Sequence, residues 1–407
     1  MNKSNKALKK MSLSVYACRK CGQCGTKVTE TVPYVCPVRE ATPGFDHFYS
    51  RGKIVIAQGL LEGKLHPDAN LARAVYSCTL CGNCMDKCGA INADTGEALV
   101  DTIGIVEAMR ADLLETHPEW VDDNYKALLT ATRQYDNPWG VPRTVKEKWA
   151  KKLSLPRARE TRTEVLLFIG CTTASTPALA QRAVKSVEIL QKAGVSVSIL
   201  GRDEPCCGSV QKRIGALAQA REMMEKNIGL LNDTGCNTIV ALCAGCANAL
   251  KNDYSQSEQK LNPRVLHLVE FLAELFKSGR LEPVKRQERK VTYHDPCHLG
   301  RHMGVYDAPR DVLNALPGIE LVERTATRKN SICCGAGGGM RVFESGNFAE
   351  KIGMAAIKSA EQTGAEDLVS ACPFCEMNLE TAGSLSGTAM TVRDIIDLVH
   401  DSVMEKK

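Results

Sequence analysis

The chain has 407 residues, a formal net charge of +5, 44% hydrophobic residues and 19 cysteines. An odd number of cysteines excludes complete internal disulfide pairing, and their grouping at CxxC spacing in a long chain favours metal binding in a reducing compartment. Lys and Arg do not cluster with aromatic residues, which argues against a nucleic-acid-binding protein, and no segment reaches the roughly 18 to 20 consecutive apolar residues of a membrane helix. We therefore expect a cytoplasmic protein of two or three domains without a membrane span of its own.

Residues 1–110 contain two groups of four cysteines. They are Cys18, Cys21, Cys24 and Cys36 in the first group and Cys78, Cys81, Cys84 and Cys88 in the second. Three cysteines at intervals of two residues followed by a fourth are typical of two-cluster ferredoxins, in which the fourth cysteine of each run binds the other cluster. Zinc is the alternative, but zinc sites use CxxC pairs. The sequence therefore predicts a helical ferredoxin-type domain with two [4Fe–4S] cubanes, held by Cys18, Cys21, Cys24 and Cys88 and by Cys78, Cys81, Cys84 and Cys36.

Residues 111–160 contain no cysteine but all three tryptophans of the chain, Trp120, Trp139 and Trp149. An Asn-Pro turn signal lies at residues 137–138. We expect this segment to be a linker that wraps around its neighbours.

Residues 161–407 contain one cysteine pattern twice: a single cysteine, then Cys-Cys-Gly, then a CxxC pair. Corresponding cysteines lie between 126 and 129 residues apart. The repeat predicts two modules, 161–285 and 286–407. Their cysteines are Cys171, Cys206, Cys207, Cys243 and Cys246 in the first module and Cys297, Cys333, Cys334, Cys372 and Cys375 in the second.

Each module has the pattern of an α/β fold. Short apolar runs at 164–170, 238–242, 291–294 and 367–371 precede cysteines and predict buried parallel strands, and the segments 178–193 and 216–231 predict helices between them. Ligands of open α/β sheets collect beyond the carboxyl ends of the strands. The predicted fold class is therefore α+β overall, with a helical ferredoxin-type domain followed by two Rossmann-like α/β modules whose thiolates gather at one edge.

Five thiolates exceed the four that complete a cubane, so the sequence leaves the form of the module sites open. His294 and His298 flank Cys297 and are candidates for hydrogen bonding to sulfur or for proton supply during reduction, with a structural role as the alternative. The pair Cys372 and Cys375 also fits a thiol–disulfide exchange motif. Cys236 belongs to neither pattern, and we expect a small buried apolar residue there.

The pattern C-x34-CC-G-x34-C-x2-C followed by C-x35-CC-G-x36-C-x2-C resembles the CCG domain of heterodisulfide reductase. With the ferredoxin-type region in the same chain, it resembles the D-type subunit of that enzyme, which fuses parts that are separate in the B-type and C-type subunits. The resemblance implies that each five-cysteine set holds a noncubane [4Fe–4S] cluster and that the pair of clusters cleaves a small-molecule disulfide. It also implies a flavoprotein or a b-type cytochrome as the electron partner, which would bring the chain to the inner face of the membrane.

The same domain occurs in iron–sulfur subunits of glycolate and lactate oxidation systems, which this chain also resembles and which relay electrons from a separate flavin dehydrogenase. In that branch one or both CxxC pairs are often degraded, whereas both are intact here, which favours disulfide chemistry. The residues after Cys171, Thr-Thr-Ala-Ser-Thr-Pro, depart from the reductases and favour the relay. A redox scaffold that uses plain thiols is the third hypothesis.

Overall fold

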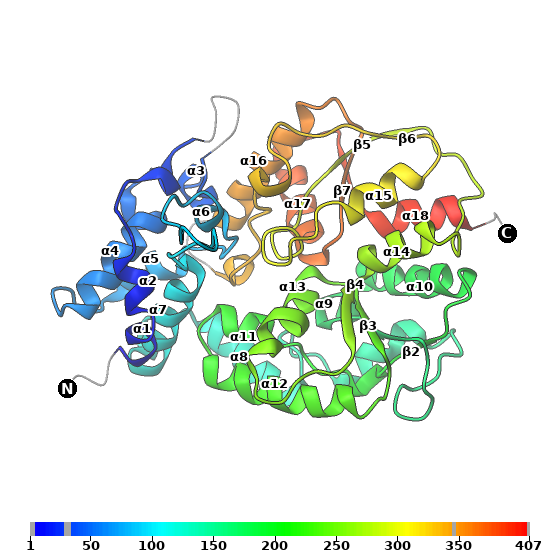
Figure 1. The fold of residues 1–407 in the computed structure, drawn as a ribbon, viewed down its shortest axis with the longest axis horizontal. Coiled ribbons are helices and arrows are strands. Elements are labelled where there is room, and N and C mark those ends of the chain that lie inside the picture. Colours follow the sequence, from blue (N-terminus) through cyan, green and yellow to red (C-terminus); the bar gives the residue numbers. More distant parts are fainter. Residues whose placement is uncertain (1–4, 28–33, 344–346, 405–407) are drawn as a thin grey trace.

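The computed structural model describes residues 5–27, 34–343 and 347–404. Figure 1 shows a helical N-terminal domain beside two α/β modules that lie one above the other. None of the helices in these described ranges is both long and apolar enough to cross a membrane.

The N-terminal domain is built from helices joined by cysteine-bearing loops. The two longest, α4 and α7, pack together through buried residues that include Ile54, Ile105 and Val106. The side chain of Asp101 accepts a hydrogen bond from Gly104 N (2.8 Å) and so caps the start of α7. The helices are α1 (Lys6–Lys9), α2 (Ser12–Tyr16), α3 (Pro37–Glu40), α4 (Ser50–Leu61), α5 (Ala69–Tyr76), α6 (Asn83–Asp86) and α7 (Thr102–Thr116).

The segment predicted as a linker is largely helical. The predicted domain end at residue 110 falls inside α7, because buried positions of that helix continue through Asp112 and Leu113. After it come α8 (Asp123–Tyr135) and a 3-10 helix at Arg143–Ala150. The segment between these two helices reaches the first module, where the indole N–H of Trp139 donates to Thr172 Oγ1 (3.2 Å).

Each module contains a four-stranded parallel sheet, and the two sheets have the same topology. The strand orders are β2-β1-β3-β4 and β6-β5-β7-β8. The four predicted strands are the central pair of each sheet, and the flanking strands were not predicted because they are short or exposed at one face. The strands are β1 (Val165–Phe168), β2 (Val197–Ser198), β3 (Thr238–Ala241), β4 (Arg264–His267), β5 (Arg289–Tyr293), β6 (Ile319–Leu321), β7 (Asp367–Ser370) and β8 (Thr391–Asp394).

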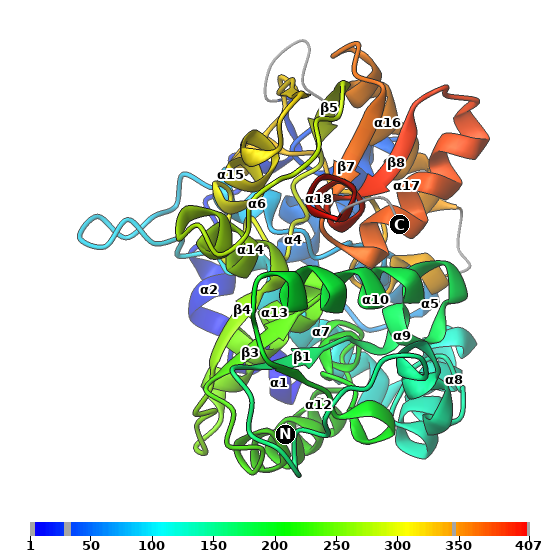
Figure 2. The ribbon, with the colours of Figure 1, turned by 90° about the vertical axis from the view of Figure 1, so that its right-hand side faces the viewer.

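Helices cover the sheets and join the modules. The predicted helices correspond to α10 and α12 of the first module. Figure 2 shows α10 of the first module running under α18 of the second. Arg182 of α10 lies among carboxylates of the second module, with Glu376 at 3.2 Å and Asp394 at 3.8 Å. The module helices are α9 (Cys171–Ser175), α10 (Pro177–Lys192), α11 (Ser209–Arg213), α12 (Leu217–Asn232), α13 (Ala244–Asn248), α14 (Leu268–Lys277), α15 (Ala308–Ala315), α16 (Phe348–Glu361), α17 (Pro373–Ser386) and α18 (Ile395–Val403).

One fully buried guanidinium joins all three parts of the chain. Arg110 of α7 is 0% exposed. It donates to Tyr76 O (2.9 Å) and Cys78 O (2.7 Å) in the N-terminal domain, to Arg213 O (2.6 Å) in the first module and to Gly338 O (2.8 Å) in the second. Buried carbonyls need such donors, so Arg110 holds together the loops that carry the cysteines.

Replacing Arg110 by Met leaves several buried carbonyls without a donor. We expect Arg110→Met to lower the free energy of unfolding by about 3 kcal/mol or more. The matched control Arg133→Met alters an exposed position of α8 and should stay within about 0.5 kcal/mol of the parent. Urea unfolding followed by circular dichroism measures both, and equal midpoints for the two variants would contradict this role.

Candidate metal centres

Four cysteines from both N-terminal groups meet in one cavity. Cys36, Cys78, Cys81 and Cys84 line a space of about 400 Å³ together with Lys53. Asn83 holds the two loops together, because its Nδ2 donates to Val35 O (2.9 Å). Burial raises the pKa of the Cys36 thiol to about 12, so this cysteine becomes a thiolate when a metal compensates its charge. The cavity therefore brings together Cys78, Cys81, Cys84 and Cys36, the four cysteines that the sequence predicts as ligands of one cubane.

The other N-terminal cysteines lie nearer the surface. Cys18 and Cys21 are close enough to Cys24 for their charges to raise its pKa, although burial is the larger cause, and Cys21 is exposed. Helix α6 packs against the turn Gln23–Gly25. A Cβ at Gly89 would lie 3.6 Å from Gln23 Oε1, so the segment at Cys88 lies next to this loop.

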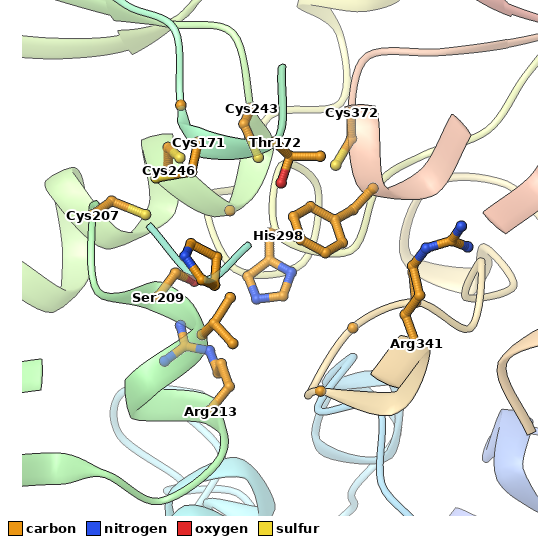
Figure 3. Close-up of a pocket in the computed structure, with 18 of the residues that line it drawn as sticks. Cys171, Thr172, Cys207, Ser209, Arg213, Cys243, Cys246, His298, Arg341 and Cys372 are labelled. Carbon is orange, nitrogen blue, oxygen red and sulfur yellow. The ribbon is translucent and has the colours of Figure 1, made fainter. Parts of the chain in front are cut away.

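The two modules share one cavity of about 1030 Å³ between them. Figure 3 shows cysteines of the first module on one side and Cys372 of the second facing Cys243. Nine of the ten module cysteines line it: Cys171, Cys206, Cys207, Cys243, Cys246, Cys297, Cys334, Cys372 and Cys375. Cys333 does not line the cavity.

The local structure explains this gathering. Cys243 follows β3 and forms the N-cap of α13, and Cys372 follows β7 and forms the N-cap of α17, whose first residue is Pro373. The carboxyl ends of parallel strands lie at one edge of a sheet, so both CxxC pairs open helices at these edges. The modules are arranged so that the two edges face each other.

The thiols form hydrogen-bonded groups in which they cannot all ionise. Hydrogen bonds from Cys206 and Cys246 lower the pKa of Cys207 to about 6, while the bonds that Cys246 donates, with its burial, hold its pKa well above the usual value. In the second module, Cys334 has a lowered and Cys375 a raised pKa for the same reasons. Clustered thiolates repel each other in a buried site, and a bound metal centre removes that repulsion. All 19 cysteines are free thiols, and the residues fit iron–sulfur clusters.

Two thiol–thiol contacts cross domain boundaries. A hydrogen bond joins Cys372 of the second module to Cys243 of the first. A second hydrogen bond joins Cys81 of the N-terminal domain to Cys333 of the second module. Within the second module, Cys297 is also hydrogen-bonded to Cys333. Cys333 therefore faces the N-terminal cavity, and sulfur atoms connect that cavity with both modules.

Both predicted histidines are buried beside cysteines. His298 lines the cavity with Nδ1 at 3.5 Å from Cys297 Sγ. A ring nitrogen of His294 lies within 4.8 Å of the sulfurs of Cys334 and Cys375. Burial lowers the pKa of His294 to about 3 and that of His298 well below its usual range. Both rings are therefore neutral, and neither ring nitrogen of His294 has a hydrogen-bond partner among the described residues.

Besides Lys53, three residues that line the inter-module cavity were not predicted from the sequence. Trp139 and Phe374 line the cavity with ring centroids 6.1 Å apart, and Arg341 lines it from the 3-10 helix Met340–Val342 that follows the glycine run. The one sequence feature that could have indicated any of these residues was the position of Trp139 directly after the predicted turn at residues 137–138. Cys236 lies apart from the other thiols, 3.8 Å from Ser198 Oγ in the first sheet, and is buried.

Comparison with known proteins agrees with the geometry. A 4Fe-4S dicluster domain matches residues 13–90, and the CCG cysteine-rich domain matches residues 165–251 and 291–380. The D subunit of the dihydromethanophenazine:CoB–CoM heterodisulfide reductase of Methanosarcina barkeri is 32% identical over 95% of this chain and 93% of its own length. The chain belongs to the family of D-type heterodisulfide reductase subunits. This confirms the resemblance seen in the sequence, and the chain is an iron–sulfur oxidoreductase subunit.

Other similarities extend beyond that protein. The corresponding D subunit of Methanosarcina mazei is 35% identical over 81% of this chain and 78% of its own length. EtfAB:quinone oxidoreductase of Syntrophomonas wolfei is 31% identical over 77% of this chain, which spans only 44% of that protein. A crystal structure of a hypothetical protein from Helicobacter pylori aligns with a TM-score of 0.54 at 11% identity, over 100% of this chain and 74% of that one. This last likeness concerns the fold alone.

Replacing Cys36 tests the exchanged ligand of the N-terminal cavity. We expect Cys36→Ala to lose one of the two reduced-cubane signals in electron paramagnetic resonance and about four irons per chain. Cys236→Ala is the control, since that thiol is buried, whereas Cys36 is half-buried, and it contacts no other cysteine among the described residues. Full iron in Cys36→Ala would exclude Cys36 as a ligand.

Proposed function

We propose that this homologue of D-type heterodisulfide reductases reduces, or forms, a small-molecule disulfide in the cavity between its modules. Cys18, Cys21, Cys24 and Cys88 would hold one cubane and Cys78, Cys81, Cys84 and Cys36 the other, and each five-cysteine set would hold a noncubane [4Fe–4S] cluster. The observation that supports this proposal most directly is that cysteines of both modules line a single cavity. When bound, the clusters supply single electrons, so that a disulfide takes up two electrons and two protons and gives two thiols.

The chain's own residues prepare the cavity for such a substrate. Trp139 and Phe374 provide an apolar wall that excludes water, and Arg341 provides a positive charge. His298 has one ring nitrogen near Cys297 Sγ, and its Nε2 has no partner among the described residues. His298 can therefore direct a proton toward a thiolate that forms in the cavity.

The second module is the one that receives electrons from the N-terminal domain. The contact between Cys81 and Cys333 supports this, and so does the hydrogen-bond-length contact of 3.1 Å between His302 Nε2 and Leu80 O. The contact between Cys372 and Cys243 continues the path into the first module. The electrons come from a flavoprotein or a b-type cytochrome partner, which brings the chain to the inner face of the membrane.

The second candidate function is an electron relay for a flavin-dependent glycolate or lactate dehydrogenase. The similarity to EtfAB:quinone oxidoreductase favours this candidate, because that protein is named as an oxidoreductase acting between EtfAB and a quinone. In a relay, the inter-module cavity binds no thiol. Thiol binding therefore separates the two functions.

A thiol titration of the anaerobically purified protein tests the disulfide chemistry. Under mild oxidation we expect a new paramagnetic signal that grows with the added thiol, because the substrate sulfur reaches the module sites through the cavity. The signal should disappear in Cys372→Ala and persist in Cys236→Ala. An iron content that corresponds to four clusters, with cubane signals that do not change on addition of any thiol, would instead support the relay.

A glycine substitution tests the electron path into the second module. A Cβ at Gly338 would lie 2.4 Å from Cys78 O, so Gly338→Ala pushes the loop after the Cys-Cys-Gly motif away from the N-terminal cavity. We expect reoxidation of the reduced cubanes by added disulfide, followed by rapid-freeze paramagnetic resonance, to slow by on the order of tenfold or more.

Gly364→Ala is the matched control for this variant. Gly338 and Gly364 have nearly equal positive φ angles of 63° and 65°, so alanine causes similar backbone strain at both, but a Cβ at Gly364 meets only Lys290 Nζ at 3.9 Å. Equal rates in the two variants would argue against electron entry beside Gly338.

A further inference from the structure

A lysine lies in the cavity predicted to hold the second cubane. Lys53 of α4 is 1% exposed and lines the cavity with Cys36, Cys78, Cys81 and Cys84. Its ammonium donates to Phe48 O (2.7 Å) and His47 O (3.2 Å). An ammonium has three donors, so one remains for an acceptor in the cavity.

No carboxylate among the described residues forms an ion pair with Lys53. Asp46, which lies close by in the sequence, forms its ion pair with Arg51 instead. Burial lowers the pKa of Lys53, whereas the charges of Cys78 and Cys36 act in the opposite direction. A buried cation without a counter-ion is strongly unfavourable. Its partner must therefore be the anionic group that the four cysteines hold.

The surroundings of the first N-terminal site differ in both charge and exposure. Cys21 is exposed. Two cations lie beside this site: the guanidinium of Arg51 would lie 2.6 Å from a Cβ at Gly22, and Arg39 donates to Gly25 O. Arg51 has a side chain that is 31% exposed and is neutralised by Asp46. Both cations of the first site are thus partly exposed, whereas Lys53 at the second site is buried and has no ion pair among the described residues.

A second buried cation near the Lys53 cavity has a different role. Arg110 uses its donors on backbone carbonyls, among them Cys78 O at 2.7 Å, and it does not line the cavity. Lys53 is thus the cation with direct access to whatever the four cysteines bind.

We propose that Lys53 sets the reduction potential of the second cubane and makes it the better electron acceptor of the two. This inference rests on the cubane assignment of the proposed function. Reduction adds one negative charge to an anionic cluster, and a nearby positive charge stabilises the reduced form most strongly in a buried site. One electron passes from the first cubane, which is oxidised, to the second, which is reduced. The step transfers one electron and no proton.

Burial alone would have the opposite effect. Removing solvent from a cluster disfavours its more negative, reduced form, so without Lys53 the buried second cubane would be the weaker acceptor. Electron transfer toward Cys333 and the second module would then be uphill. Lys53 reverses this order.

A redox titration monitored by paramagnetic resonance tests the proposal on the full chain. We expect Lys53→Met to shift the midpoint potential of one cubane signal to a more negative value, with the other signal and the iron content unchanged. Lys53→Arg keeps the charge and should restore most of the shift. Lys64→Met is the control, since Lys64 is exposed and paired with Glu62, and both midpoints should stay in place. Unchanged midpoints in Lys53→Met overturn the proposal.

A measurement on the unmodified protein decides the question if Lys53→Met fails to assemble its cluster. A dysprosium chelate in solution relaxes exposed paramagnetic centres more than buried ones. The cubane with the higher potential should be the one that is less relaxed. If the more relaxed cubane has the higher potential, the proposal fails.

These outcomes separate this inference from the disulfide chemistry. A potential shift without any thiol-dependent signal supports Lys53 and removes the disulfide function. A thiol-dependent signal with unshifted cubane potentials supports the disulfide function and overturns the role of Lys53. The absence of both cubane signals overturns both proposals.

Discussion

Loops from three parts of the chain meet at the guanidinium of Arg110. One follows α5 and leads into Cys78, one ends α11 of the first module, and one follows the Cys-Cys-Gly motif of the second. Backbone carbonyls at such a buried junction require donors, and arginine supplies five in one rigid plane. The relative positions of the cysteine sites depend on this junction, because each of its loops begins or ends within a few residues of a site cysteine or a cavity residue.

The two modules share a topology but not an environment. Their sheets have the same strand order, yet within the described residues only the second module has a cysteine, Cys333, in contact with an N-terminal cysteine. Phe168 stands three residues before Cys171, where His294 stands before Cys297. The repeat therefore gives the two modules a similar arrangement of five cysteines, and contacts with residues outside the repeated pattern give the two sites different surroundings.

Charge compensation links the sites to one another. The module cysteines are buried, as are Cys81 and Lys53 of the N-terminal cavity. The histidines beside Cys297 are held neutral by burial. Cations reach the sites from specific helices and loops, with Lys53 from α4 and Arg341 from the second module. Because buried charges interact strongly over short distances, these few side chains have a large influence on the electrostatic potential at the cysteine sites.

The sequence by itself determined the family, the cysteine groups, the repeat and the central strands of both sheets, because these features are encoded in local spacing and periodicity. It did not reveal that both modules face one cavity, that Cys81 meets Cys333, or that Trp139 of the predicted linker reaches Thr172. Nor did it indicate that Lys53 lies beside four cysteines. These features join residues far apart in the chain, so only the packing of whole domains against each other decided them.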